Sequence, residues 1–279
     1  MLFRSGALRP VGELADDFLG PSLASYWWAG QLWAVPVDAA CQVAAYHPAR
    51  LAAPPRSYAE ALALRQPVAA SLVGVHALMA LLTLLNARGT PLVDYWPAGL
   101  ELAADQLREL TARCLPESLD WNPLQLLAAL GAGRFDYAVF TFAYVNFQKQ
   151  GVRFAPVPSR GAVVGGTGLA VSAHSRHPEA ALAWARLAGS LEVQTTIWPQ
   201  HGGQPAHRAA WDDLAKSDPF YRDLRPAIET AWVRPRYAGW NGRQLRAGNI
   251  INRWLRGARG PRQLRIELEE LWNQTGTTK

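Results

Sequence analysis

The side chains that most readily do chemistry form no recognisable catalytic group in this sequence. Four of the six histidines lie close together, at His174, His177, His201 and His207. No pair of them has the HxxxH or HExxH spacing that zinc ligation from one helix requires. The glycines of 166–168 lack the third glycine of a dinucleotide-binding fingerprint, and no Walker lysine follows them. We therefore expect a protein that is not an enzyme and that holds no cofactor and no metal.

The cysteines and the charge argue against two further classes. Cys41 and Cys114 are far apart and belong to no CxxC pair, so neither a zinc site nor a disulfide framework is indicated. The formal net charge is +6, but the basic residues are mostly scattered arginines, with one denser stretch at 234–265. No motif of a nucleic-acid-binding protein accompanies them. We expect no nucleic acid among the partners.

Short strand-like runs alternate with amphipathic helices, which predicts an α/β fold. The strand candidates are 32–37, 135–142 and 162–172, the last of them interrupted by glycines that mark a bend or a close backbone approach. Asn122 and Pro123 suit the N-cap and first positions of a helix. Further helices are predicted at 74–86, where His76 is expected to be a satisfied interior histidine, at 100–114, from Pro178 and at 264–272.

The helix from Pro178 should carry one apolar face. Its members are Trp184, Leu187, Ala188 and Leu191. The chain's apolar runs stop well short of the roughly 20 residues that a membrane-spanning helix needs. We expect no export signal in the first residues, because no sustained apolar region follows their basic residue.

Three motifs in the middle of the chain carry a resemblance to a known family. They are GGTGLAVSAHSRHPEAALAW at 165–184, SLEVQ at 190–194 and GGQPAHR at 202–208. In order and spacing they resemble the family 1 extracellular solute-binding proteins of ABC importers, in which a GG-x-G strand precedes HPEAA, SPEVQ and GG-x-P-x-x-R. Leu191 replaces the usual proline of the second motif.

Other segments extend the resemblance over most of the chain. GQLWAVPVDAA at 30–40 is similar to the family's strand that crosses between lobes, and PPRSYAE at 54–60 to the element after it. The segments 234–237 and 255–257 resemble the family's proline-containing segment of the second lobe and its closing helices. The family's first strand, helix and strand, which precede the segment resembling 2–14, have no counterpart here. We therefore expect an N-terminally truncated version of a longer protein, and whether Met1 is the true start stays open.

The resemblance implies a periplasmic-binding-protein-like type II fold, with two α/β lobes joined by crossing hinge strands. The implied division is 1–42 and 162–203 for lobe I, and 43–161 and 204–279 for lobe II. Such a protein closes on a small solute and delivers it to the permease subunits of an ABC transporter. A monomer in the periplasm or outside the cell is the implied state.

The resemblance also indicates the binding residues. A carboxylate and an arginine can fix sugar hydroxyl groups, and an aromatic face can cover sugar C–H groups. Trp240, beside Gly239 and Asn241, is expected in a loop with its ring available. Many relatives have an aromatic residue that stacks on the ligand at the position of Thr167, where this chain has a hydroxyl group. The predicted ligand-binding residues are Asp38, Tyr144, Asn146, Gly165, Gly166, Thr167, Arg236 and Trp240.

A sugar or polyol is the expected solute, and two alternatives stay open. The net positive charge of the chain also fits an organic acid or another solute that is not a sugar. The anion partners would then be Arg134, Arg153 and Arg236. A nonfunctional truncated fragment would expose a sheet edge and tend to aggregate.

Overall fold

A computed structural model describes residues 6–237 and 239–274 of the chain. The prediction about the segment 2–14 thus falls partly on residues 1–5, outside the described residues. The chain divides into two compact units. Unit 1 comprises residues 1–41, 144–146 and 164–233, and unit 2 comprises residues 42–143, 147–163 and 234–279.

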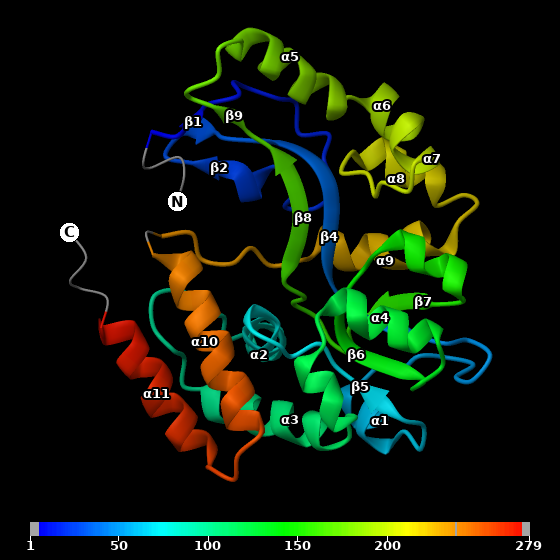
Figure 1. Cartoon of the computed structure of the whole chain (residues 1–279), viewed down its shortest axis with the longest axis vertical. Coiled ribbons are helices and arrows are strands. Elements are labelled where there is room, and N and C mark those ends of the chain that lie inside the picture. Colours follow the sequence, from blue (N-terminus) through cyan, green and yellow to red (C-terminus); the bar gives the residue numbers. More distant parts are fainter. Residues whose placement is uncertain (1–5, 238, 275–279) are drawn as a thin grey trace. The chain divides into compact units, whose positions relative to one another are not determined.

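A long antiparallel ladder forms the centre of unit 1 (Figure 1). It joins the first half of β4 (Val35–Tyr46) to β8 (Val164–Leu169), with an irregularity between Pro36 and Asp38. Two short antiparallel pairs accompany it: β1 (Leu8–Arg9) with β9 (Val171–Ser172), and β2 (Trp27–Trp28) with β3 (Gln31–Leu32). Since residues 42–46 of β4 belong to unit 2, this strand crosses between the units, as predicted.

The helices of unit 1 follow β9. They are α5 (Pro178–Ala188), α6 (Leu191–Thr195), α7 (Ile197–Gln200), α8 (Arg208–Leu214) and α9 (Pro219–Glu229), besides the short η1 (Ala24–Tyr26). The apolar face predicted for α5 is covered only at Ala188. Trp184 is 61% exposed, and Leu187 and Leu191 are exposed too. A 3.6-residue period identifies an apolar stripe but does not say whether another element covers it.

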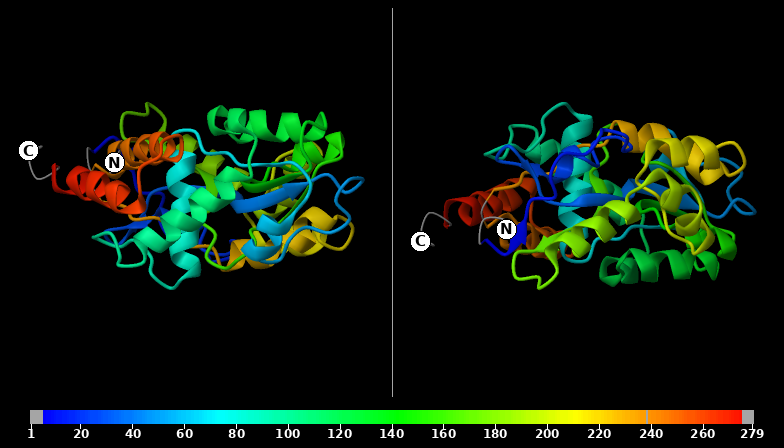
Figure 2. Two further views of the ribbon diagram at one scale, coloured as in Figure 1. Left: turned by 90° about the horizontal axis from the view of Figure 1, so that it is seen from below. Right: turned by 90° about the horizontal axis from the view of Figure 1, so that it is seen from above.

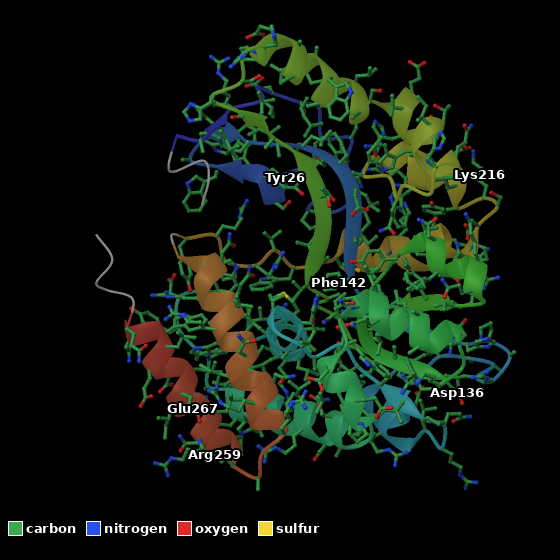
Figure 3. All side chains as sticks on the ribbon, in the orientation of Figure 1. Tyr26, Asp136, Phe142, Lys216, Arg259 and Glu267 are labelled. Atoms are coloured by element: carbon green, nitrogen blue, oxygen red, sulfur yellow. The ribbon has the colours of Figure 1, made fainter. Side chains whose placement is uncertain are left out.

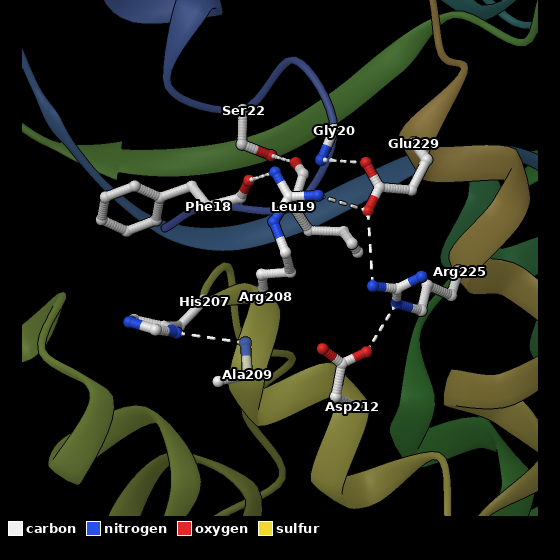
Figure 4. A network of polar contacts seen from close by, with 10 residues as sticks. All are labelled: Phe18, Leu19, Gly20, Ser22, His207, Arg208, Ala209, Asp212, Arg225 and Glu229. Carbon is white, nitrogen blue, oxygen red and sulfur yellow. Dashed lines mark hydrogen bonds and ion pairs between the residues drawn. The ribbon is translucent and has the colours of Figure 1, made fainter. Parts of the chain in front are cut away.

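Residues 204–233, which were expected in lobe II, lie in unit 1. A polar network explains the difference (Figure 4). The Arg208 guanidinium contacts Glu229 Oε1 at 2.7 Å and donates to the Phe18 carbonyl at 2.9 Å, while Gly20 N donates to Glu229 Oε2 at 3.1 Å. Arg225 adds ion pairs with Glu229 and Asp212, at 3.7 and 2.8 Å. These contacts fasten α8 and α9 to the loop that precedes η1.

Unit 2 contains a sheet with strand order β5-β6-β4-β7. In it β5 (Val68–Ala69) runs parallel to β6 (Tyr137–Phe142), whereas β4 runs antiparallel to both β6 and β7 (Arg153–Pro156). Its helices are α1 (Tyr58–Ala63), α2 (Val75–Ala87), α3 (Leu100–Ala112), η2 (Pro116–Asp120), α4 (Pro123–Gly131), α10 (Trp240–Leu255) and α11 (Pro261–Asn273); η3 (Val145–Gln150) is shared between the units.

The helices predicted in this part of the chain are confirmed. The Asn122 side chain accepts from Gln125 N, and the Gln125 side chain accepts from Asn122 N, both at 3.0 Å, which is a capping box at the start of α4. Helix α2 is buried from Ala77 to Leu85. His76, however, is not fully satisfied, because its Nδ1 is buried without a hydrogen-bond partner among the described residues.

Helices α10 and α11 run in opposite directions (Figure 1) and pack against each other, as the orange and red helices in the left view of Figure 2 show. At their connection Arg259 pairs with Glu267 at 3.1 Å (Figure 3), and Trp254 Nε1 donates to the Gly260 carbonyl at 3.1 Å. On its other side α10 packs against α2. A Cβ at Gly248 would lie 2.0 Å from the carbonyl oxygen of Gly74, so only a glycine permits this approach.

Replacing Gly248 by alanine is expected to lower the free energy of unfolding by about 1–3 kcal/mol, because the backbone of Gly74 must move to admit the methyl group. Gly242, in the same helix, is exposed and has no atom within 4 Å of a Cβ placed there. Gly242→Ala should therefore be neutral or stabilising by up to about 1 kcal/mol. Urea denaturation of both variants measures the difference, and equal effects would contradict the close packing of α10 on α2.

Candidate functional site

The predicted site residues of unit 1 meet on the ladder between β4 and β8. Asp38 on β4 lies opposite Thr167 on β8, and Gly166 lies opposite Ala39. Gly166 has φ +108°, and a Cβ there would lie 2.3 Å from the Asp38 carbonyl oxygen. A glycine is thus required beside Asp38. Gly166 and Thr167 are exposed and Gly165 is half-buried, so this stretch leaves its backbone accessible.

Asp38 is an ionisable group of this ladder whose acidity is strongly perturbed. Burial raises the pKa of its carboxyl to about 7. Tyr144 and Tyr221 respond to it: burial first and the Asp38 charge second raise the pKa of Tyr144, and burial followed by the charges of Asp218 and Asp38 raises that of Tyr221. The charge of Asp38 thus acts on two phenol groups of unit 1, and we call these three electrostatically coupled groups the Asp38 cluster.

Tyr221 is a member of this cluster that sequence reasoning missed. It lies near the start of α9, where Asp218 caps the helix by accepting from Phe220 N at 2.9 Å. Only 3% of Tyr221 is exposed, and its ring meets that of Trp211 edge-to-face at 4.9 Å. Trp211 is fixed in turn by donating from Nε1 to the Pro205 carbonyl at 2.6 Å. The DPFY sequence signals a helix start but not its distance from Asp38.

Tyr144 and Asn146 belong to the short segment that returns from β6 to unit 1. Asn146 Nδ2 donates to the Gly202 carbonyl at 3.0 Å, which ties this segment to the loop before α8. Tyr144 is 40% exposed and carries the segment's phenol group. Asn146 thus has a positioning contact within unit 1, and the pKa of Tyr144 responds to the charge of Asp38.

The two predicted residues of unit 2 differ from each other. Arg236 is half-buried, and burial lowers the pKa of its guanidinium, which stays a cation. The expectation of a loop position for Trp240 was wrong. This residue begins α10, is only 3% exposed and packs edge-to-face against Tyr237 and Trp272 at 5.5 and 6.2 Å. Its ring fills the core of unit 2 and offers no face for stacking.

A separate groove of about 520 Å³ opens on the surface of unit 1. None of the predicted site residues lines it. Asp17, Arg186 and His207 are its ionisable members. Arg186 is occupied by donating to the Val11 carbonyl at 2.8 Å, and His207 Nδ1 accepts from Ala209 N at 3.3 Å.

Among residues 6–237 and 239–274, no three histidine, cysteine, aspartate or glutamate side chains come together in an arrangement that could hold a metal ion. None of the helices in these ranges combines the length and the apolar character that crossing a membrane requires.

Several solved structures share this fold. MalE3 of T. maritima with bound maltose is 17% identical, with a TM-score of 0.81 over 97% of this chain and 81% of that one. An ABC transporter solute-binding protein of Thermotoga lettingae with bound alpha-D-tagatose is 17% identical, with a TM-score of 0.82 over 98% and 81%. A third, from Agrobacterium vitis with bound D-mannitol, is 16% identical, with a TM-score of 0.78 over 98% and 81%.

These likenesses confirm the predicted fold class of two α/β lobes joined by crossing strands. A search of curated proteins found no match. The family model described as bacterial extracellular solute-binding protein matches residues 2–223, which is most of the chain and includes the three motifs at 165–208. The protein is therefore a member of the bacterial extracellular solute-binding protein family.

Proposed function

We propose that the protein captures a sugar or polyol and delivers it to the permease subunits of an ABC importer. Membership of the solute-binding family assigns it binding and not catalysis. The observation that carries the choice of solute is the fold shared with proteins whose structures contain maltose, tagatose and mannitol. The family is extracellular, and we place this protein in the periplasm or outside the cell, as a monomer.

The proposed binding residues in unit 1 are Asp38, Tyr144, Asn146, Thr167 and the backbone at Gly165 and Gly166, and in unit 2 Arg236. A carboxylate accepts hydrogen bonds from two hydroxyl groups, and the exposed glycines let a ligand approach the backbone closely. A solute stabilises a closed state to the extent that it binds that state more tightly than the open one. Trp240 is not included, because its ring is buried in unit 2.

A thermal-shift screen of the purified chain against sugars, polyols and organic acids tests this proposal. A ligand that binds only the folded state raises the melting temperature by mass action, by an amount that grows with its concentration. We expect a concentration-dependent increase with at least one neutral sugar or polyol. A cooperative melt that moves only with organic acids would transfer the function to the alternative class of solute.

A further inference from the structure

The groove on the surface of unit 1 is separate from the residues of the proposed function. Its volume of about 520 Å³ is within the range of about 300–1,000 Å³ that small-molecule sites occupy. Its lining comes from the segment 14–18, from Val35 of β4, from the segment 186–191 and from the start of α8 at 207–209. All of these belong to unit 1. A ligand held here is therefore additional to the proposed sugar or polyol.

Backbone hydrogen bonds hold the first of these segments in place. Just before it, Val11 N donates to the Leu32 carbonyl at 2.8 Å. Near its end, Arg208 N donates to the Asp17 carbonyl at 2.7 Å. The groove is thus bounded by a wall that is tied to unit 1 on both sides.

Apolar side chains make up much of the lining. Phe18 and Val35 are 4% and 1% exposed, Leu14 is half-buried, and Leu191 is 45% exposed. The Phe18 ring lies 5.9 Å from the His207 ring, measured between centroids. An apolar group of a ligand would lose contact with water against these side chains, which favours its binding.

Two opposite charges also line the groove, Asp17 and Arg186. Among the described residues, neither forms an ion pair with the other or with any third group. One N–H of Arg186 donates to the Val11 carbonyl at 2.8 Å, and the guanidinium keeps its other donors. A Cβ at Gly12 would lie 2.7 Å from Nη2 of Arg186, so a glycine makes room for the arginine here.

His207 supplies a further donor. Its Nδ1 accepts from Ala209 N at 3.3 Å (Figure 4), so the proton of the neutral ring is on Nε2. Burial lowers the pKa of His207, and the charge of Asp17 opposes this only in second place. The ring is therefore mainly neutral at pH 7. The groove thus combines an apolar lining with one carboxylate, one guanidinium and one imidazole N–H.

We infer that this groove binds a free α-amino acid with an apolar side chain. The carboxylate of the ligand accepts hydrogen bonds from Arg186 and His207, its ammonium group donates to Asp17, and its side chain packs on the apolar lining. A simple carboxylic acid would set a second negative charge beside Asp17, and a simple amine would set a second positive charge beside Arg186. A zwitterion satisfies both charges.

Isothermal titration calorimetry of the full chain at pH 7 with L-phenylalanine tests the inference. Three related compounds each lack one feature of this ligand: phenylpropionate lacks the ammonium group, phenethylamine the carboxylate and L-serine the apolar side chain. We expect saturable one-to-one binding of L-phenylalanine. Each of the three others should bind at least about tenfold more weakly, because one group of the groove then has no partner.

Asp17→Asn is the matching change in the protein. It should weaken L-phenylalanine by about tenfold and remove the preference for L-phenylalanine over phenylpropionate, because an amide attracts an ammonium group less than a carboxylate does. Asp16→Asn is the control, since Asp16 is exposed, adjacent in sequence and outside the lining of the groove. This variant should bind all four compounds like the wild-type protein.

The outcomes distinguish this inference from the proposed function. Absence of saturable L-phenylalanine binding, or an Asp17→Asn variant that keeps the full preference over phenylpropionate, would overturn the inference. Displacement of L-phenylalanine by the neutral sugar or polyol found in the thermal-shift screen would place both in one site and would overturn it as well. In each case the proposed capture of a sugar or polyol would stand, because it depends on other residues.

Discussion

Replacing Gln194 by leucine is expected to lower the free energy of unfolding of unit 1 by about 3–5 kcal/mol. The Gln194 side chain is fully buried and makes four hydrogen bonds. Its oxygen accepts from Ala206 N and His207 N at 2.6 and 2.9 Å, and its nitrogen donates to the carbonyls of Val37 and Ala188 at 3.3 and 3.1 Å. Leucine has a similar volume but leaves all four backbone groups without this partner.

The effect should be specific to this position. Gln200, on α7 of the same unit, is exposed, so Gln200→Leu should change stability by no more than about 0.5 kcal/mol. Urea denaturation followed by tryptophan fluorescence compares the two variants. A Gln194→Leu protein as stable as the wild type would show that the side chain does not join β4, α5 and the loop before α8 in solution.

The second large effect concerns Asp38 in the absence of any solute. Its pKa of about 7 in the folded protein compares with about 3.9 in an unfolded chain. Between these values the folded state holds a proton that the unfolded state has released. Stability from this residue is therefore complete below about pH 4 and is lost as pH rises through 7. The loss amounts to at most about 4 kcal/mol.

Asp38→Asn should remove this dependence, because an amide stays neutral. At pH 8 the variant is expected to be more stable than the wild-type protein, and at pH 4 the two should be nearly equal. Asp16→Asn, at an exposed position of unit 1, is the matched control and should melt like the wild type. Calorimetric melting from pH 4 to 8 measures all three proteins. An Asp38→Asn variant that is less stable at pH 8 would show that the carboxylate is satisfied within the free protein.

At Asp38 the wild-type carboxylate weakens the free fold at neutral pH, and the same residue is one of the proposed ligand-binding groups. A residue that lowers stability at the place where a ligand is bound is typical of functional sites.

Local patterns predicted much of the fold correctly. The helix at α4 was evident because Asn122, Pro123 and Gln125 satisfy the backbone of its first turn with their own side chains. The crossing strand β4 and the glycine strand β8 followed from motif order as well as from apolar runs. In each of these cases the determining interactions lie within a few residues or within one strand pair.

The failures involve partners that are distant in the sequence. Trp240 follows Gly239 like a loop residue, but Tyr237 and Trp272 enclose its ring. Tyr221 lies on α9, which Glu229 ties to the loop at Gly20, a contact between residues 209 positions apart in the sequence. The exposed stripe around Trp184 has the same periodicity as a covered one. Sequence spacing alone cannot distinguish these arrangements.

The central claim is that this receptor binds a neutral hydroxylated solute, and it is tested most directly with two ligands that share a carbon skeleton. Calorimetric titration at pH 8 would compare the neutral compound identified by the screen with its carboxylate analogue, for example D-mannitol with D-mannonate. The account predicts saturable one-to-one binding of the neutral compound and much weaker binding of the acid. Tighter binding of the acid, with no heat from the neutral compound, would contradict it.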